Sequence, residues 1–287
     1  MEQIAFGLER SPDDGCRRYL AHAVSFDTRA RILSMEIDES WDDEVRKGWL
    51  GTQQGIRMSL IHEHGNADHE RKIEDFQAIG PAPWTIIDKH NVFLKQARSA
   101  FTHGAYYPAL VAACALGERL LNELVIRLRD DYVGHPATAS VATQTTITDW
   151  VKCIAALVDW GVLDDDTATV LNELRKLRNK SIHYGEHLSG ATIRDDALSA
   201  VRSIQSVIET VFAPHGAPPR FISGTEGHSF LSLASEQEPF FKRFYLPACV
   251  LVSSNFEMRP TPEDSMAVFD DKTYQDEYPS LTDEEFA

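Results

Sequence analysis

Apolar residues recur at helical spacing through the middle of the chain, between about residues 86 and 213. The apolar runs are separated by residues that break or cap helices, among them Gly104, Gly161 and Pro214. Apolar positions three and four residues apart fall on one face of an α-helix, so each run predicts an amphipathic helix. The predicted helices cover residues 86–103, 107–132, 147–160, 164–184 and 192–212.

The second of these helices carries the clearest apolar stripe. Pro108 suits its first turn, where a missing N–H removes no helical hydrogen bond. Two positions of the stripe, Cys114 and Gly117, are small, and small residues allow a neighbouring helix to approach closely. The stripe comprises Leu110, Cys114, Gly117, Leu121, Leu124 and Leu128.

The two flanks of this region have mixed patterns. Residues 30–37 predict a short strand, and residues 41–63 predict an amphipathic helix with Ser40 as its N-cap. After Pro219, residues 221–222, 230–233 and 248–252 predict short strands, with a short helix over residues 236–244. The chain beyond Ser254 is polar and acidic, so we expect it to be mobile.

These patterns together predict a mainly α protein, a helical bundle with small flanking β/α elements at both ends. We divide the chain into a mixed α/β flank (residues 1–84), the bundle (residues 85–213), a small β-containing element (residues 214–254) and an acidic tail (residues 255–287). The length of 287 residues suits one large domain or two small ones.

The charge of the chain limits the classes of partner. The formal net charge is −16. The acidic tail has ten acidic and two basic residues, so its own net charge of −8 is half of that total. A protein that coats nucleic acid without specificity is usually basic, because lysine and arginine must displace the phosphate counterions. The composition therefore argues against a general nucleic-acid binder, although local basic clusters remain.

Composition also bears on location and cofactors. The sequence contains no apolar run long enough to cross a membrane and no basic segment preceding an apolar one, so we expect neither membrane insertion nor a secretory leader. The four cysteines lie far apart, which favours reduced thiols in a cytoplasmic protein. His62, His64 and His69 lie near acidic residues, but their spacing does not match the H-E-x-x-H zinc motif, so we expect no metal and no other cofactor.

Candidate chemistry is concentrated near the end of the fourth predicted helix. Four basic residues lie within six positions there, followed by a histidine and a tyrosine. Asn179 and His183 are four residues apart and share a helix face, whereas Arg178 lies at the edge of that face. The segment contains Arg175, Lys176, Arg178, Asn179, Lys180, His183 and Tyr184.

These residue types suit cleavage of RNA without a metal. Such a reaction needs a base for the 2′-hydroxyl, an acid for the leaving oxygen and a cation for the charge on the phosphoryl group. Histidine titrates near neutrality, and arginine is a permanent cation that contacts two oxygens at once. Because one copy of the segment offers a single histidine, a two-fold dimer would supply the second proton-transfer group.

The segment resembles a known family motif. Arg178, Asn179 and His183 match the R-N-x3-H form of the HEPN superfamily motif, and the preceding stretch from Tyr107 to Leu121 also looks HEPN-like. The resemblance covers roughly residues 86–213. HEPN domains are helical bundles that commonly dimerise, and many are metal-independent ribonucleases in toxin–antitoxin, anti-phage and RNA-processing systems.

The resemblance implies a role for each residue. His183 would act on the 2′-hydroxyl or the leaving group, Arg178 would bind the scissile phosphate, and Asn179 would support their geometry. Glu118, on the earlier long helix, is a polar candidate for the same region. Some such toxins are inactivated at a tyrosine two residues after the histidine; Gly185 occupies that position here, next to Tyr184. We include Glu118, Arg175, Lys176, Lys180 and Tyr184 as candidate substrate-binding residues.

Other interpretations remain open. Arg178 and His183 are also consistent with simple stabilisation of a helix C-terminus, and the neighbouring bases with a solvated basic face. The chain would then be a non-catalytic HEPN-like module for dimerisation, nucleotide binding or partner binding, or a regulatory subunit that docks onto another enzyme. If it is a nuclease, its partners would be RNA, a second copy of itself and an antitoxin or regulatory protein. One hypothesis is that the acidic tail covers the basic motif and holds it inactive.

Overall fold

The computed structural model describes residues 4–5, 18–21, 25–85, 88–143, 149–182, 190–212, 221–225, 230–253, 256–260, 266–269 and 281–287. The chain forms two compact units. A helical unit consists of Ser25–Trp84 and Asp88–Val211, and a mixed unit consists of Met1–Val24, Thr85–Ile87 and Phe212–Ala287. Each unit therefore combines segments that are distant in the sequence.

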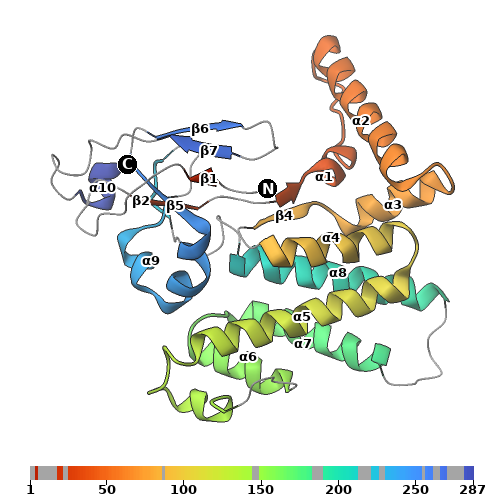
Figure 1. Ribbon diagram of the computed structural model, residues 1–287. Helices are drawn as coiled ribbons and strands as arrows, with labels where there is room; N and C mark the ends of the chain where they lie inside the picture. Colours follow the sequence, from red (N-terminus) through yellow and green to blue (C-terminus); the bar gives the residue numbers. More distant parts are fainter. Residues whose placement is uncertain are drawn as a thin grey trace. The chain divides into compact units, whose positions relative to one another are not determined.

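The helical unit confirms the predicted mainly α class (Figure 1). A short pair of strands, β3 (Ser25–Asp27) and β4 (Ala82–Thr85), precedes and interrupts the helices. The helices are α1 (Arg29–Leu33), α2 (Asp43–His64), α3 (His69–Ile79), α4 (Asp88–Thr102), α5 (Tyr106–Leu128), η1 (Pro136–Ser140), α6 (Trp150–Asp159), α7 (Asp165–Ile182) and α8 (Gly190–Phe212).

Helix α5 provides the core of this unit. It packs against α4, α6 and α7, and its apolar stripe is almost completely buried, with Leu120, Leu121 and Leu124 inaccessible to solvent. Leucine and alanine dominate α5, and both favour helix while burying apolar surface. Five predicted helices thus appear as α4 to α8, with ends shifted by a few residues, as expected where local periodicity is strong.

Helix α3 is joined to the bundle by polar contacts. The buried carboxylate of Asp75 accepts hydrogen bonds from Arg71 (2.7 Å), Tyr106 (2.8 Å) and Arg194 of α8 (2.7 and 3.0 Å). At the C-terminal end of α3, Arg202 of α8 donates to the carbonyl of Ala78 at 2.7 Å. A cation at the last carbonyls of a helix satisfies their lone pairs and complements the helix dipole.

The N-terminal part of the helical unit departs from the sequence-based expectation. Residues 30–37 do not form a strand, because Ala30 and Leu33 are buried three residues apart on the short helix α1. Helix α3, which the apolar pattern did not predict, buries Ile73 and Phe76 against α1 and α2. Here packing between short segments determined the structure, and the local pattern was too brief to show it.

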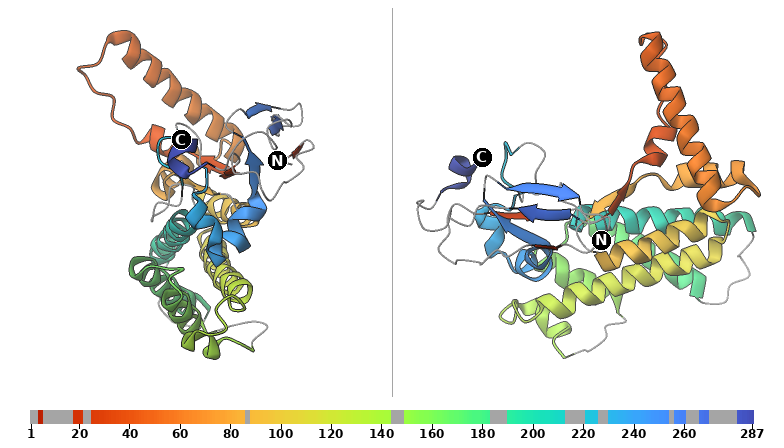
Figure 2. Two further views of the ribbon diagram at one scale, coloured as in Figure 1. Left: turned by 90° about the vertical axis from the view of Figure 1, so that its left-hand side faces the viewer. Right: turned by 45° about the horizontal axis from the view of Figure 1, so that its top comes forward.

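Helix α2 extends away from the rest of the helical unit in all the ribbon views (Figures 1 and 2). Asp42 caps its first turn, accepting from the N–H of Glu44, and only Leu60 and His64 are buried along it.

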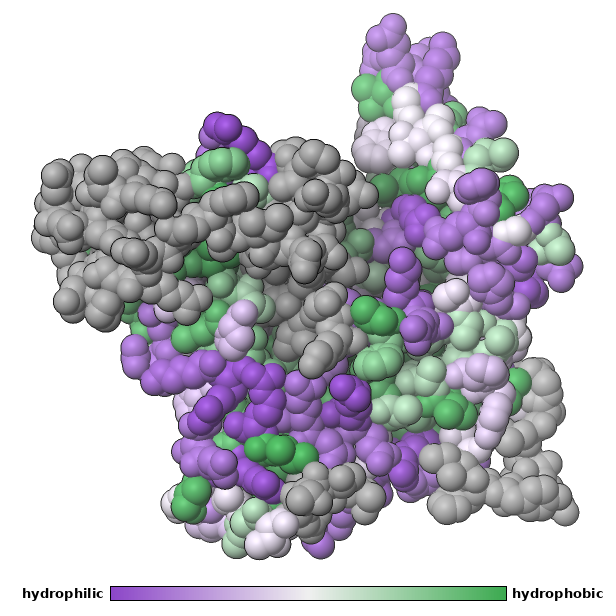
Figure 3. Space-filling model, viewed as in Figure 1, coloured by the Kyte–Doolittle hydropathy of each residue, from purple (hydrophilic) through white to green (hydrophobic). Residues whose placement is uncertain are grey.

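In the view of Figure 3, hydrophilic residues predominate on the drawn surface of the helices, and apolar residues form small separate groups. No helix in the described part of the chain has the length and apolar character needed to cross a bilayer.

The mixed unit contains the remaining short strands. Strand β2 (Arg18–Ala21) pairs antiparallel with β5 (Cys249–Val252), and β7 (Met266–Phe269) lies between β1 (Ile4–Ala5), which is parallel to it, and the antiparallel β6 (Glu257–Pro260). Its helical elements are α9 (Leu233–Gln237), η2 (Phe241–Tyr245), η3 (Leu246–Ala248) and α10 (Asp283–Phe286). The predicted strand near residue 221 forms only an isolated bridge, Phe221 to Leu231.

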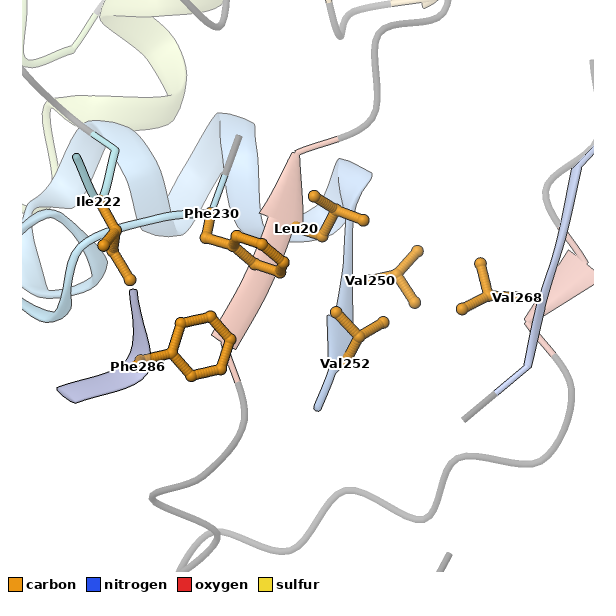
Figure 4. Close-up of a cluster of buried hydrophobic side chains, with 7 residues drawn as sticks. All are labelled: Leu20, Ile222, Phe230, Val250, Val252, Val268 and Phe286. Atoms are coloured by element: carbon orange, nitrogen blue, oxygen red, sulfur yellow. The ribbon is translucent and has the colours of Figure 1, made fainter. Parts of the chain in front are cut away.

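Figure 4 shows the apolar cluster at the centre of the mixed unit. The cluster combines side chains from the N-terminal and C-terminal parts of the chain: Leu20, Ile222, Phe230, Val250, Val252, Val268 and Phe286. The last two lie in described parts of the acidic tail. The tail therefore contains apolar anchors among its charged residues, and Arg18 of β2 also pairs with Asp283 at 3.4 Å. Removal of the whole tail would open this core.

Candidate functional site

The predicted motif lies on the last turns of α7. Asp164 begins this helix by accepting a hydrogen bond from the N–H of Thr167 at 2.7 Å, and Asp165 and Asp166 place negative charge at its N-terminal end. Leu171 and Leu174 are completely buried and fix which face of α7 meets the bundle. The basic residues that follow are consequently held at defined angles around a rigid helix.

Gly117 of α5 sets how closely α7 approaches. A Cβ atom at this position would lie 2.8 Å from Leu174 Cδ2 and 2.9 Å from a ring carbon of Trp150. These separations are shorter than carbon atoms tolerate, so glycine allows α5, α6 and α7 to meet here without a shift of Leu174 or Trp150. The next residue along α5 is Glu118, which this close approach brings to the surface of α7.

Glu118 and Arg178 form an ion pair across the two helices. Arg178 Nη2 lies 2.9 Å from Glu118 Oε2, and about a quarter of each side chain is exposed, 25% and 27%. Arg178 Nη1 also lies 3.4 Å from Asn179 Oδ1. The structure thus brings together three of the residues that the sequence singled out, Glu118, Arg178 and Asn179, with the guanidinium partly open to solvent.

The neighbouring lysines lie on a different side of α7. Lys176 pairs with Glu173 at 2.6 Å, and Lys180 pairs with Asp196 of α8 at 2.6 Å. Both line a shallow hollow of about 370 Å³ between α7 and α8. A helix turns by about 100° per residue, so Arg178 is about 160° from each lysine around the axis. The basic cluster is therefore divided between two faces.

The remaining motif residues complete this description. Arg175 is partly buried, and its Nε has no hydrogen-bond partner among the residues that the structure describes. The carbonyl of Ser181 accepts a 3.4 Å hydrogen bond from the hydroxyl of Tyr107, which ties the end of α7 to the start of α5. His183 and Tyr184 lie outside the described residues.

Cysteine chemistry is not favoured beside the ion pair. Cys114 lies one turn before Glu118 on α5, and Cys153 of α6 is completely buried. Burial raises the pKa of each thiol to about 12. Only the thiolate is a good nucleophile, so both side chains act as small apolar residues at neutral pH.

The histidines of α2 and α3 do not gather around a common point. His62 is exposed, His64 is buried, and His69 contacts the backbone carbonyl of Asn66. Within the described ranges, no three His, Cys, Asp or Glu side chains form a cluster suited to a metal ion.

A second cavity was not predicted from the sequence. It has a volume of about 720 Å³, lies in the helical unit and contains none of the motif residues. Its wall on α4 includes Asn91, Lys95, Arg98 and Thr102. The signal for it is visible in retrospect, because these polar residues recur at helical spacing beside the apolar face of α4.

Comparison with known proteins finds one family model that matches part of the chain. Residues 95–234 match the model of a domain of unknown function, DUF4145. This match covers just under half of the chain and includes both Glu118 and Arg178. Searches against curated proteins and against solved structures found no match. The comparison therefore delimits a domain that contains the ion pair and leaves its chemistry to be argued from the residues.

Proposed function

We propose that the helical unit is a HEPN-type endoribonuclease that cleaves RNA without a metal ion. The observation that carries the proposal is the ion pair between Arg178 and Glu118, at the position where the R-N-x3-H motif requires a phosphate-binding cation. A carboxylate on a separate helix holds the guanidinium in one place, and Asn179 contacts it from the same helix. A preorganised cation is what stabilisation of a charged transition state needs.

The proposed reaction assigns one task to each group. Arg178 binds the scissile phosphate through N–H groups that its two neighbours do not use, since a guanidinium carries five donors. His183 transfers a proton to or from the reacting oxygens, so the 2′-hydroxyl attacks phosphorus and the 5′-oxygen leaves. Asn179 orients the phosphate or the histidine.

A single chain provides one histidine in this motif. General acid and general base catalysis proceed best with two groups in opposite protonation states, one to accept a proton and one to donate it. We therefore propose a homodimer in which two copies of α7 face a shared groove. A two-fold axis would place the second Arg178 and His183 on the opposite side of the same phosphate.

The charge distribution bears on the substrate. The chain has a net charge of −16, and Lys176 and Lys180 are paired with carboxylates of the same unit. These two lysines of the motif are then less available for phosphate contacts, and the negative net charge weakens long-range attraction of RNA. We propose that the enzyme acts on a defined RNA structure presented to it rather than on RNA in general.

A nuclease acting inside a cell must be controlled. We accordingly propose a cytoplasmic toxin or anti-phage effector, held in check by an antitoxin or another regulatory protein. This biological setting rests on the resemblance to HEPN ribonucleases.

One observation favours a second function. Three described cations of the motif form ion pairs: Lys176, Arg178 and Lys180. Each of them has its partner within the helical unit. A non-catalytic module for dimerisation, nucleotide binding or partner binding would show the same internal neutralisation, because such a module has no need of a cation directed at phosphate.

RNA cleavage in EDTA distinguishes the two functions. Purified wild-type protein should cleave at least one of tRNA, mRNA or rRNA, leaving 2′,3′-cyclic phosphate ends. His183→Ala should remove this activity, and Arg178→Ala should lower it about a hundredfold to a thousandfold to a measurable residual level, while both proteins remain folded. His62→Ala, which changes an exposed histidine on α2, is the matched control and should cleave normally. Absence of cleavage by the wild type on all three substrates would favour the non-catalytic module.

A further inference from the structure

The cavity in the helical unit is built from six separate elements. Its walls come from the β3–α1 junction, the end of α2, the middle of α3, strand β4 and one face of α4. Its volume of about 720 Å³ falls in the range of sites that enclose small organic molecules. Phe26, Phe76 and Leu94 provide apolar lining.

Two buried polar side chains on this lining have nitrogen atoms without a hydrogen-bond partner among the described residues. Asn91 is 8% exposed, and its Nδ2 has no partner; His64 is 9% exposed, and neither ring nitrogen has one within the described part of the chain. Burial also lowers the pKa of His64, so the ring is neutral near pH 7. Buried donors are nearly always satisfied in folded proteins, so each of these atoms calls for a partner such as an ordered water, an ion or a ligand.

The charges around the cavity have an excess of one positive charge. Arg29 is paired with Asp27 and Glu63, both at 2.8 Å, so these three groups sum to −1. Burial alone would raise the pKa of Asp27, but hydrogen bonds from Arg29 outweigh it and keep that pKa below its usual value. Arg98 and Lys95 then add two positive charges.

Arg98 and Lys95 differ in how they are held. Arg98 is buried and donates to the side-chain oxygen of Gln205 and to the carbonyl of Gly80. Burial lowers its pKa to about 10, at which the guanidinium is still a cation near neutrality. Lys95 is exposed at the cavity wall, has no ion pair among the described residues, and lies one helical turn from Asn91.

We propose that this cavity binds a small organic anion, with an oxyanion head group against Asn91 and Lys95 and a flat apolar body against Phe76 and Leu94. The amide N–H of Asn91 and the ammonium of Lys95 supply donors to the head group from one face of α4. Carboxylates and phosphates share this chemistry. The site is distinct from the Arg178 motif and does not depend on the proposed ribonuclease activity.

Ligand-observed NMR and calorimetry on the full chain test this assignment. The probes are benzoate, phenyl phosphate and benzylammonium, which pair a similar ring with a carboxylate, a phosphate and a cation. At least one anion should bind saturably below about 10 mM, with benzylammonium at least about tenfold weaker. The stronger anion identifies which head group the site prefers. Binding of neither anion, or equal binding of benzylammonium, would overturn the proposal.

Two variants locate the binding. Lys95→Glu should weaken the anion at least about tenfold, whereas Lys47→Glu, the same change at an exposed position on α2, should not. Asn91→Leu should also weaken binding while raising the melting temperature, because it replaces an unsatisfied buried amide with an apolar side chain. Equal affinity in Lys95→Glu and wild type would overturn the site. His183→Ala should bind like wild type, which separates this result from the test of nuclease activity.

Discussion

Arg178 Nη2 lies 2.9 Å from Glu118 Oε2, and the two residues belong to different helices, α7 and α5. Both side chains are about a quarter exposed, so water and salt screen the pair and its contribution to folding is small, about 0–1 kcal/mol. Its more important consequence is positional. A guanidinium fixed by a carboxylate presents its remaining donors in one direction, as binding of a phosphate requires.

Glu118→Gln tests whether this positioning matters. The amide keeps the shape of the side chain but removes the charge that orients Arg178. Cleavage in the assay above should fall about tenfold to a hundredfold, because a misplaced catalytic group loses that much. The melting temperature should change by only a few degrees.

A double-mutant cycle provides the control. If Glu118 acts through Arg178, adding Glu118→Gln to Arg178→Ala should lower cleavage no further. Normal cleavage by Glu118→Gln would show that the carboxylate has no role in orienting the guanidinium.

Gly117→Ala should destabilise the helical unit. The added methyl group would lie 2.8 Å from Leu174 and 2.9 Å from Trp150, so these buried side chains or the helices that carry them must shift, at a cost of about 1–3 kcal/mol. Gly51→Ala is the matched change, since a Cβ at Gly51 in α2 meets nothing within 4 Å. Alanine is the better helix former, so Gly51→Ala should stabilise by about 0.5–1 kcal/mol. Urea unfolding measures both, and the same sign for the two would contradict this account of Gly117.

Asp75→Asn should destabilise α3 and its attachment to the bundle. The carboxylate is buried and faces Arg71, Arg194 and Tyr106, so its loss removes the buried counter-charge of two guanidinium groups and leaves Arg194 with only the exposed Asp195, at 3.7 Å. We expect a loss of about 2–4 kcal/mol in the free energy of unfolding. Glu74→Gln, at the exposed neighbouring position, should change it by less than about 0.5 kcal/mol. A comparable loss in the two variants would argue against the buried network.

Glu236 should make the mixed unit less stable as the pH rises. Burial raises the pKa of this carboxyl to about 7. The positive charge of Arg18 opposes this rise, and the negative charge of Asp283 adds to it. A raised folded-state pKa means that the stabilisation is fully present below about pH 4.5 and is lost as the pH rises through about 7. Partial exposure limits the effect to about 1–2 kcal/mol.

Thermal unfolding at pH 5 and pH 8 measures this dependence. Glu236→Gln cannot ionise, so its melting temperature relative to wild type should be higher at pH 8 than at pH 5. Glu238→Gln, an exposed change just after α9, should show no such difference. An equal effect of Glu236→Gln at the two pH values would indicate an ordinary pKa.

Local sequence pattern accounted for much of the fold and for part of the candidate site. Helices α4 to α8 were predictable because their apolar positions repeat over three or more turns between clear breaks. Short segments were not, and α1 and α3 owe their conformation to contacts such as those of Phe76 and Asp75 with other elements. The division of the basic residues around α7 also follows from helix geometry alone, since Lys176 and Lys180 share a face that excludes Arg178.

The sequence by itself therefore determined the mainly helical class, the positions of the main bundle helices and the composition of the motif on α7. The tertiary structure alone decided that Glu118 meets Arg178, that Lys180 meets Asp196, and that Arg29, Phe76 and Asn91 line one cavity. The physical reason is the distance along the chain over which each interaction acts. Helix periodicity is a property of neighbouring residues, whereas contacts between distant segments depend on how helices pack, and a single small residue such as Gly117 determines how closely they do so.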